Sequence, residues 1–343
     1  MRAIAYRQPG PIDRPDALVD VELPKPAPTG RDILVKVQAV SVNPVDAKVR
    51  AGASPFDGRA ERILGWDAAG VVEAVGPEVS RFQVGDEVFY AGDLMRDGSN
   101  AEYQLVDERI VGHRPRSIGV AEAAALPLTT ITAWETLFDR LKVDDQPASG
   151  ARAILIIGGA GGVGSAAIQI ARARTDLTVI ATASRTETQD WVRDLGAHHV
   201  LDHSQPMAPQ IAALGIGAPA FVFSTTHTDR HLTDIAELIA PQGRFALIDD
   251  PASLDIVGFK RKAVSVHWEL MFTRSLFGTP DLIEQGRLLD TVAELVDAGR
   301  IRTTATETLS PISTATLTEA HRRIESATTR GKIVLEGWEA RHD

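Results

Sequence analysis

A run of small residues, "GGAGGVGS", separates an apolar segment from an amphipathic one near the middle of the chain. Its glycines follow the pattern G-x-G-x-x-G, with Gly159, Gly161 and Gly164 at the three positions. The first glycine permits a tight turn, the second lets a pyrophosphate approach the backbone, and the third lets a helix pack closely on a strand. Unpaired N–H groups at the start of such a helix attract phosphate. The pattern predicts a dinucleotide site formed by Gly159, Gly161, Gly162, Val163 and Gly164.

The end of the following strand indicates which dinucleotide binds. A site for NAD usually places Asp or Glu about 20 residues beyond the turn, where the carboxylate binds the ribose 2′-hydroxyl. At that distance this chain has Ser184 and Arg185. A carboxylate would repel a 2′-phosphate, whereas a hydroxyl and a guanidinium bind it. We therefore expect NADPH as the coenzyme. Ser224 and Thr225 end a later strand and are expected to contact it as well.

The elements that must position these residues differ between the two halves of the chain. From "AILII" onward, short apolar runs alternate with helical patterns through "LTVIATA", "AFVFS" and "RFALIDD". Repeated β–α units with short connections indicate a doubly wound parallel sheet. Residues 1–125 instead hold short strands separated by Gly and Pro, typical of a β barrel or sandwich. The fold class is therefore α/β.

Composition excludes several kinds of partner. The 343 residues include 46 acidic and 36 basic side chains, a net charge of −10, which argues against nucleic acid or an anionic membrane as a partner. Because there is no Cys, disulfides, thiolate metal ligands and Cys nucleophiles are excluded. No long apolar run or leader-like start is present. We expect a cytoplasmic protein that acts on a small molecule.

Several further stretches resemble the medium-chain dehydrogenase/reductase superfamily over essentially the whole chain. They include "SVNPVDAKVRAG", "LGWDAAGVVEAVG", "LPLTTITAWETL", "LGAHHVLDH" and "GKIVLEG". The chain is most similar to the quinone oxidoreductase-like branch and to the group named zinc-type alcohol dehydrogenase-like proteins. This resemblance implies a GroES-like β domain built by both chain ends, with a central Rossmann domain and an active site between them. The implied division is 1–125, 126–295 and 296–343, and a homodimer is expected by analogy.

The resemblance also identifies the positions where zinc-containing members hold their catalytic metal. At these three positions the chain has Asn43, Trp66 and Leu128. Catalytic zinc needs about three side-chain ligands, and Asp67 alone does not supply them. Histidines elsewhere are expected to be structural. We therefore expect no metal, although a zinc alcohol dehydrogenase with unusual ligands remains an alternative.

Without a Lewis acid, a simple alcohol is a difficult substrate because nothing lowers its pKa. A quinone or an α,β-unsaturated carbonyl accepts hydride more easily, since the resulting phenolate or enolate is delocalised and can be stabilised by hydrogen-bond donors. NADPH-dependent reduction of quinones or enones is the expected activity. A protein that binds NADPH without turning it over is a second alternative.

Roles for individual residues rest on the resemblance. It places Asn43 and Thr132 near the nicotinamide, where Asn43 either donates to an acceptor oxygen or serves as a turn residue. Asp46 and Asp67 are expected to hold neighbouring groups in place, and Asp67 equally fits an internal ion pair. Trp66 is either an apolar wall for a flat acceptor or a core residue. Lys332 is expected at a surface turn.

Overall fold

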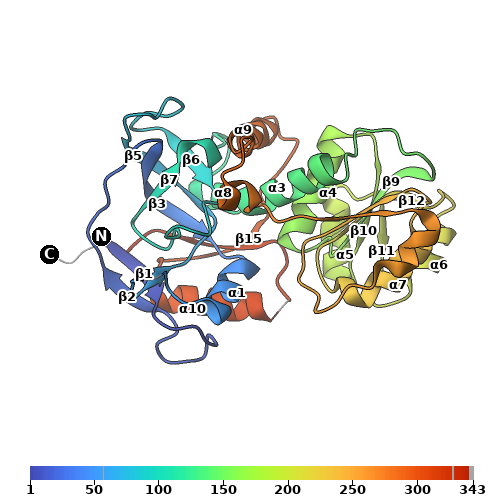
Figure 1. Cartoon of the computed structure of the whole chain (residues 1–343), viewed down its shortest axis with the longest axis horizontal. Helices are drawn as coiled ribbons and strands as arrows, with labels where there is room; N and C mark the ends of the chain where they lie inside the picture. Colours follow the sequence, from blue (N-terminus) through green and yellow to red (C-terminus); the bar gives the residue numbers. More distant parts are fainter. Residues whose placement is uncertain (57, 327, 340–343) are drawn as a thin grey trace. The chain divides into compact units, whose positions relative to one another are not determined.

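The computed structural model describes residues 1–56, 58–326 and 328–339. The chain forms two compact units, one made of Met1–Leu128 with the chain from Phe272 onward, the other of Thr129–Met271. In Figure 1 the first unit contains both the blue and the red ends of the chain, and the second holds the green-to-orange middle. The two chain ends therefore build one domain, as the resemblance implied.

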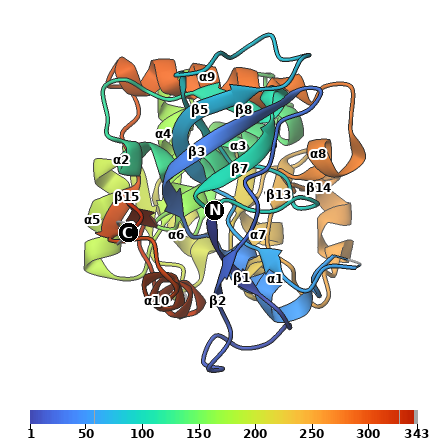
Figure 2. The same cartoon turned by 90° about the vertical axis from the view of Figure 1, so that its left-hand side faces the viewer.

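The first unit is mainly antiparallel β structure (Figure 2). Within the described residues it has a three-stranded sheet in the order β2-β1-β4 and a seven-stranded sheet in the order β15-β16-β3-β5-β6-β8, with β7 also paired to β3. Its strands are β1 (Arg2–Tyr6), β2 (Val19–Glu22), β3 (Asp32–Ser41), β4 (Arg62–Ile63), β5 (Ala68–Val75), β6 (Glu87–Tyr90), β7 (Tyr103–Asp107), β8 (Val111–His113), β15 (Ala305–Leu309) and β16 (Lys332–Glu336). The late strands β15 and β16 thus complete a sheet begun near the N-terminus.

Strand β3 is the centre of this unit because it pairs with β5, β7 and β16. Ile33 and Val35 of β3 are fully buried, consistent with the apolar run in the sequence. Gly70 of β5 lies so close to β3 that an added Cβ would sit 2.2 Å from the Lys36 carbonyl oxygen. Asn43 follows the end of β3 and Asp67 precedes β5, so the pairing of these strands fixes both residues.

The second unit contains a six-stranded sheet in which every neighbouring pair of strands is parallel, in the order β11-β10-β9-β12-β13-β14. Its strands are β9 (Ala151–Ile157), β10 (Thr178–Thr182), β11 (His199–Leu201), β12 (Pro219–Ser224), β13 (Arg244–Leu247) and β14 (Ser265–Trp268). The order reverses between β9 and β12, which is the doubly wound arrangement. Dinucleotides bind at the carboxyl ends of such strands, at this reversal.

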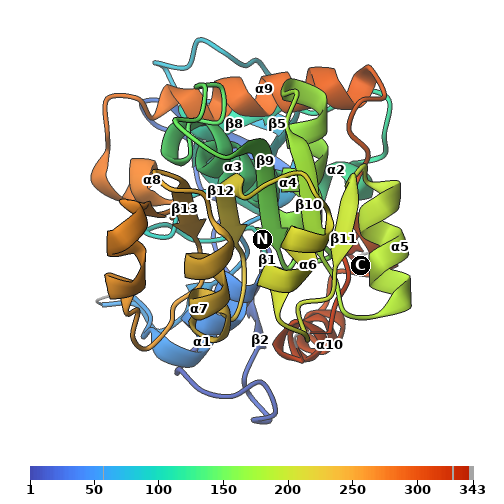
Figure 3. The ribbon, with the colours of Figure 1, turned by 90° about the vertical axis from the view of Figure 1, so that its right-hand side faces the viewer.

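Helices cover both faces of the parallel sheet. Figure 3 looks onto the side of α6 and α7, whose apolar residues pack with Leu155, Val222 and Phe245 of the strands. The helices of this unit are α4 (Gly162–Arg174), α5 (Thr186–Asp194), α6 (Met207–Ala213), α7 (Thr228–Leu238) and the 3₁₀ segment η3 (Ile256–Lys262). Helix α3 (Pro127–Trp134) begins in the first unit, enters the second, and continues as the π-helical η2 (Glu135–Arg140).

The remaining helices belong to the first unit. They are α1 (Pro44–Gly52), α2 (Val120–Ala124), η1 (Glu108–Ile110), α8 (Thr273–Phe277), α9 (Ile283–Asp297) and α10 (Thr314–Glu325). In the part of the chain that the structure describes, no helix combines the length and apolarity needed to cross a membrane.

Helix α9 differs from the sequence-based division, which assigned residues up to 295 to the Rossmann domain. It packs on β8 and η1 of the first unit. The approach is close: a Cβ on Gly286 would lie 2.6 Å from the Arg109 carbonyl oxygen. Asp290 of the same helix also forms an ion pair with Arg81, at 2.8 Å. These contacts move the second boundary to about residue 271.

Candidate functional site

The glycine turn connects β9 to α4, where the sequence predicted it. Gly159 N–H donates to the Thr182 carbonyl oxygen of β10, at 3.0 Å. An added Cβ on Gly164 would lie 2.3 Å from the Gly158 carbonyl oxygen, so the helix and the turn require a glycine there. At Gly161, which precedes α4, an added Cβ would meet nothing closer than 3.6 Å. Gly164 therefore serves packing, whereas Gly161 leaves room for a phosphate to approach the backbone.

The carboxyl end of β10 lies next to this turn because β9 and β10 are paired in parallel. Ser184 and Arg185 follow β10, and both side chains are exposed. Arg185 is the residue before α5, and its guanidinium lies 3.7 Å from the Glu187 carboxylate. The edge therefore offers a hydroxyl and a guanidinium, with the Glu187 carboxylate on the first turn of the helix. A hydroxyl and a guanidinium suit a ribose 2′-phosphate better than a free ribose 2′-hydroxyl.

The residues at the end of β12 hold the sheet edge together. The Ser224 hydroxyl lies 2.8 Å from the Thr228 hydroxyl, which donates to Asp249 after β13. Thr225 donates its hydroxyl to the Ile157 carbonyl oxygen of β9, at 2.9 Å. Ser224 is buried and Thr225 half-buried. Both follow the carboxyl end of a parallel strand. We call this edge of the sheet, where Gly161, Ser184, Arg185, Ser224 and Thr225 lie, the ligand edge, because such sheets bind dinucleotides there. The coenzyme contacts of Ser224 and Thr225 stay a prediction.

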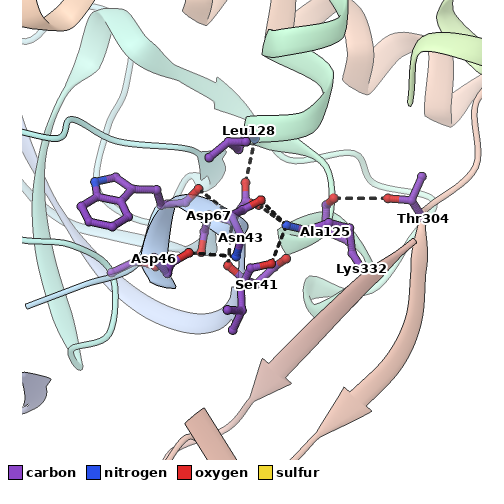
Figure 4. Close-up of polar contacts among 11 residues, drawn as sticks. Ser41, Asn43, Asp46, Asp67, Ala125, Leu128, Thr304 and Lys332 are labelled. Carbon is purple, nitrogen blue, oxygen red and sulfur yellow. Dashed lines mark hydrogen bonds and ion pairs between the residues drawn. The ribbon is translucent and has the colours of Figure 1, made fainter. Parts of the chain in front are cut away.

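In the first unit, the predicted catalytic residues gather around the carboxylate of Asp67 (Figure 4). Its Oδ1 accepts from the Leu128 N–H at 2.7 Å. Its Oδ2 accepts from the Lys332 ammonium at 3.0 Å and from the Asn43 amide at 2.9 Å. Lys332 and Asp67 are both buried, with side chains 3% and 0% exposed. We call Asn43, Asp46, Asp67 and Lys332 the buried polar network.

Asn43 is fully engaged within this network. Its amide nitrogen also approaches the carbonyl oxygens of Trp66 and Ser41, at 3.3 and 3.4 Å. Its amide oxygen accepts from Lys332, which donates in addition to the Val42 carbonyl oxygen at 2.9 Å. Since an amide nitrogen has two hydrogens, no donor of Asn43 is left over for an acceptor oxygen in this arrangement. The contacts support a positioning role for Asn43 rather than the donor role.

Asp46 closes the other side of the network. Its Oδ2 accepts from the Asn43 backbone N–H at 2.8 Å and so caps the first turn of α1. Burial raises the pKa of the Asp46 carboxyl to about 7, although the Asn43 hydrogen bond and Lys332 act in the opposite direction. Burial also raises the pKa of Asp67, again opposed by Lys332. One ammonium thus serves two buried carboxyl groups.

Trp66 and Thr132 are both buried. The indole ring of Trp66 packs edge-on against Phe272, with ring centroids 6.3 Å apart, and its N–H donates to the Asp93 carbonyl oxygen at 3.2 Å. These contacts are those of a core residue. Thr132 lies in α3, in the part of that helix that belongs to the second unit, and its carbonyl oxygen accepts from Thr136. Its place near a nicotinamide stays a prediction.

The residues at the zinc positions do not fit zinc. Asn43 and Trp66 are committed to the contacts above, and Leu128 contributes only its backbone N–H to the network. Both oxygens of Asp67 already accept hydrogen bonds. Among the residues that the structure describes, no group of three or more His, Cys, Asp or Glu is arranged to hold a metal. A catalytic zinc site needs such a group.

Lys332 is the member of the buried polar network whose position sequence reasoning did not predict. The expectation of a surface turn was wrong, because Lys332 is the first residue of β16 and is buried against Asp67. The apolar run "IVL" directly after it, together with a carboxylate expected in an internal ion pair, was the signal available in the sequence. That expected ion pair of Asp67 is confirmed, with Lys332 as the partner.

Comparison with known proteins agrees with this architecture. Residues 29–132 match the model of the alcohol dehydrogenase GroES-like domain, and residues 195–335 match that of a zinc-binding dehydrogenase. A zinc-type alcohol dehydrogenase-like protein of Staphylococcus aureus is 41% identical over 98% of this chain and 99% of its own. The human mitochondrial NAD(P)H oxidoreductase RTN4IP1 is 31% identical over 89% of this chain and 81% of its own.

Solved structures extend the comparison. A Rhizobium etli protein described as a candidate zinc-dependent alcohol dehydrogenase is 64% identical, with a TM-score of 0.98 over 99% of both chains. A Pseudomonas syringae quinone oxidoreductase is 26% identical, with a TM-score of 0.81 over 98% of this chain and 99% of its own. The CurK enoyl reductase is also 26% identical, with a TM-score of 0.82 over 98% of both chains. With a GroES-like unit, a Rossmann unit and these relatives, the chain belongs to the medium-chain dehydrogenase/reductase superfamily, as an oxidoreductase of that family.

Proposed function

We propose that this oxidoreductase uses NADPH to reduce a quinone or an α,β-unsaturated carbonyl, and that it does so without zinc. The observation that carries the proposal is the saturated carboxylate of Asp67. At the place where the resemblance puts the catalytic metal of zinc-containing members, this carboxylate is bound by Lys332, Asn43 and the Leu128 N–H. The described side chains there form no metal ligand set, which supports a reaction that does not activate an alcohol through a bound cation.

The coenzyme assignment rests on the edge of the parallel sheet. The glycine turn would hold the pyrophosphate through the backbone around Gly161 and the start of α4. Ser184 and Arg185 would hold the 2′-phosphate. When bound, the coenzyme supplies a hydride, and a proton from solvent completes the two-electron reduction of the acceptor. The names of relatives support both the coenzyme and the acceptor. One relative is named an NAD(P)H oxidoreductase, and two others are named a quinone oxidoreductase and an enoyl reductase.

The buried polar network has a positioning task in this proposal. Asp46 and Asn43 fix the start of α1, and Asp67 fixes the start of α3 through Leu128. Thr132 lies one turn further along α3, where the helix continues into the coenzyme-binding unit. The network therefore holds the N-terminal end of a helix that bears a predicted coenzyme contact. We also propose that the protein acts as a homodimer on small molecules, by analogy with such folds.

Coenzyme oxidation by the purified protein tests the proposal. NADPH and NADH are each supplied with a panel of quinones, enones and simple alcohols or aldehydes, with and without a chelator, and the metal content is measured. We expect turnover of NADPH with a quinone or enone, in preparations without stoichiometric zinc and with no effect of the chelator. Zinc-dependent alcohol oxidation would overturn the proposal in favour of the alcohol dehydrogenase alternative. Tight NADPH binding without turnover on any acceptor would favour the non-catalytic binder.

Arg185→Ala tests the coenzyme choice separately. Loss of a guanidinium–phosphate pair is expected to raise the KM for NADPH about tenfold or more, with the KM for NADH within about twofold. The matched control is Arg193→Ala, which removes an exposed arginine within α5. Equal changes for both coenzymes in Arg185→Ala would contradict the assignment of this edge to the 2′-phosphate.

A further inference from the structure

Arg62 of β4 is a buried arginine whose charge has no partner of opposite sign among the described residues. The residue is only 7% exposed. Its Nη2 donates to the Leu94 carbonyl oxygen at 2.6 Å, and its buried Nε–H has no hydrogen-bond partner. Because arginine stays protonated in proteins, the fold buries a permanent cation here. Such a charge is costly unless an anion accompanies it.

The acidic residues of the neighbouring segments do not supply that anion. They are Glu61, which precedes Arg62, and the two aspartates of the loop that accepts its hydrogen bond. Each makes another contact: Glu61 pairs with Arg7, Asp97 pairs with Arg59, and Asp93 accepts from the Met95 N–H. None of them approaches Arg62 closely enough to form an ion pair. The missing anion is therefore not provided by these neighbours.

The surroundings of the guanidinium leave room for in-plane hydrogen bonds. The central carbon of the guanidinium lies 4.4 Å from the centre of the Phe56 ring, so an aromatic face covers the cation. Tyr6 is paired with Arg62 across β1 and β4. Burial raises the pKa of Tyr6, whereas the nearby Arg62 lowers it. Stacking uses the face of a guanidinium, and its N–H groups point outward in the plane, where a carboxylate is matched by two of them.

A shared loop connects Arg62 to the region of the buried polar network. Arg62 donates to the Leu94 carbonyl oxygen, and the Trp66 indole N–H donates to the preceding carbonyl, that of Asp93, at 3.2 Å. Trp66 stands at one of the metal-ligand positions and is followed by Asp67. Arg62 and Trp66 therefore hold consecutive peptide groups of one loop in the first unit.

We propose that Arg62 binds a carboxylate of the acceptor, so that the acceptor is an electrophile that also carries a carboxylate group. The proposal rests on the proposed function, because it narrows the acceptor of that reaction. For an enone, hydride from NADPH adds to the β-carbon, the π electrons move to the carbonyl oxygen, and a solvent proton adds at the α-carbon. The products are NADP⁺ and the saturated carbonyl compound. The carboxylate takes part only in binding.

Two acceptors that differ by one negative charge test the proposal. They are 4-oxo-4-phenylbut-2-enoate and its methyl ester, and NADPH oxidation is measured with each at about pH 8, where the carboxylate is ionised. We expect the wild type to have the lower KM for the acid. In Arg62→Met the KM for the acid should rise about tenfold or more, as for a lost hydrogen bond to a charged group, and the KM for the ester should change by less than about twofold.

Two further variants sharpen the test. Arg62→Lys keeps the charge but loses the planar pair of donors, so the KM for the acid should lie between those of the wild type and Arg62→Met. The matched control is Arg7→Met, which removes an exposed arginine next to Tyr6 and should leave the ratio of the two KM values unchanged. Because each variant is compared on two acceptors, a general loss of folded protein does not alter the ratio.

Binding of the saturated analogues, 4-oxo-4-phenylbutanoate and its methyl ester, is measured by calorimetry and does not depend on turnover. If the wild type shows no preference for the acids, or Arg62→Met affects acid and ester equally, Arg62 only holds the loop and the proposal is overturned. NADPH oxidation with the ester or another acceptor would then leave the proposed function intact. If no acceptor is reduced, the proposed function fails by itself, and binding of the saturated acid that is lost in Arg62→Met still supports the carboxylate site.

Discussion

The two regions that carry the predicted chemistry are built in opposite ways. In the first unit, the buried polar network satisfies every donor and acceptor it presents, with Lys332 shared between the Asp67 carboxylate and the Asn43 amide oxygen. At the ligand edge of the second unit, Ser184 and Arg185 are exposed and a Cβ on Gly161 would meet nothing closer than 3.6 Å. A saturated cluster holds backbone in place, whereas an edge with space and polar groups is suited to receiving a ligand.

This contrast changes how the predicted catalytic residues should be understood. Asn43, Asp46 and Asp67 are brought together as expected, but by contacts that use up their polar atoms. Removing a member of the network should therefore act first on stability. Removing a group at the ligand edge should act first on coenzyme binding.

The largest expected effect is that of Lys332→Met. It leaves the Asp67 carboxylate buried without its cation, so the free energy of unfolding should fall by about 3–5 kcal/mol. Arg193→Met is the matched control, since its ion pair with Asp190 is exposed and should be worth less than about 1 kcal/mol. Urea denaturation followed by circular dichroism measures both. A loss below about 1 kcal/mol for Lys332→Met would show that the network is not a stabilising cluster.

Next comes the pH dependence that Asp46 introduces. Its pKa in the folded protein is about 7, above the value of about 3.9 expected in the unfolded chain. Between these values the folded state binds more protons, so the contribution of Asp46 to the free energy of unfolding falls as the pH rises from about 4 to about 7. The slope is at most about 1.4 kcal/mol per pH unit.

Asp46→Asn removes this contribution while its side-chain oxygen can still accept from the Asn43 N–H. The free energy of unfolding of the wild type, measured relative to that of Asp46→Asn, should therefore fall as the pH rises from about 4 to about 7. Above about pH 7 it should stay constant. Denaturation of both proteins from pH 4 to pH 8 gives this difference directly. A difference that does not change with pH would mean that Asp46 is ionised throughout.

Two glycines of one turn provide the clearest test of the contrast. Gly164→Ala brings a Cβ to 2.3 Å from the Gly158 carbonyl oxygen, and this overpacking should cost about 1–3 kcal/mol of stability. Gly161→Ala meets nothing closer than 3.6 Å, so stability should change by less than about 0.5 kcal/mol. Its Cβ instead obstructs the phosphate approach, and the affinity for NADPH should fall. Melting temperatures and coenzyme titrations distinguish the two, and a reversed order would refute the assigned roles.

The smallest effect on ligand binding is expected for Trp66→Phe. This change keeps an aromatic ring against Phe272 but loses the hydrogen bond to the Asp93 carbonyl oxygen, at a cost of about 1 kcal/mol. If Trp66 is a core residue, the KM for quinone acceptors should stay within about twofold of wild type. An increase specific to flat aromatic acceptors would instead restore Trp66 as a wall of the acceptor site.

The parts of the molecule that sequence reasoning predicted depend on local patterns. The turn from Gly159 to Gly164 and the strands around it carry their signal within a few residues, so the Rossmann unit and its ligand edge could be placed. The pairing of Asp67 with Lys332 depends instead on β16 joining β3 across most of the chain. Residue types alone do not specify such a long-range register, and Lys332 was misplaced for that reason.

Helix α9 illustrates the same limit. The sequence-based division assigned most of this helix to the Rossmann domain, whereas the structure places it in the first unit. That choice depends on the close approach at Gly286 and on Asp290 meeting Arg81, neither of which has a local signature.

The absence of cysteine bears on the proposed acceptors. Quinones and enones are electrophiles that alkylate thiolates, and an enzyme that concentrates them risks modifying its own cysteines. This chain has no cysteine in its 343 residues. The amine of Lys332, which contacts Asn43, is buried and engaged with a carboxylate. A protein assembled in this way offers such acceptors no thiol to attack.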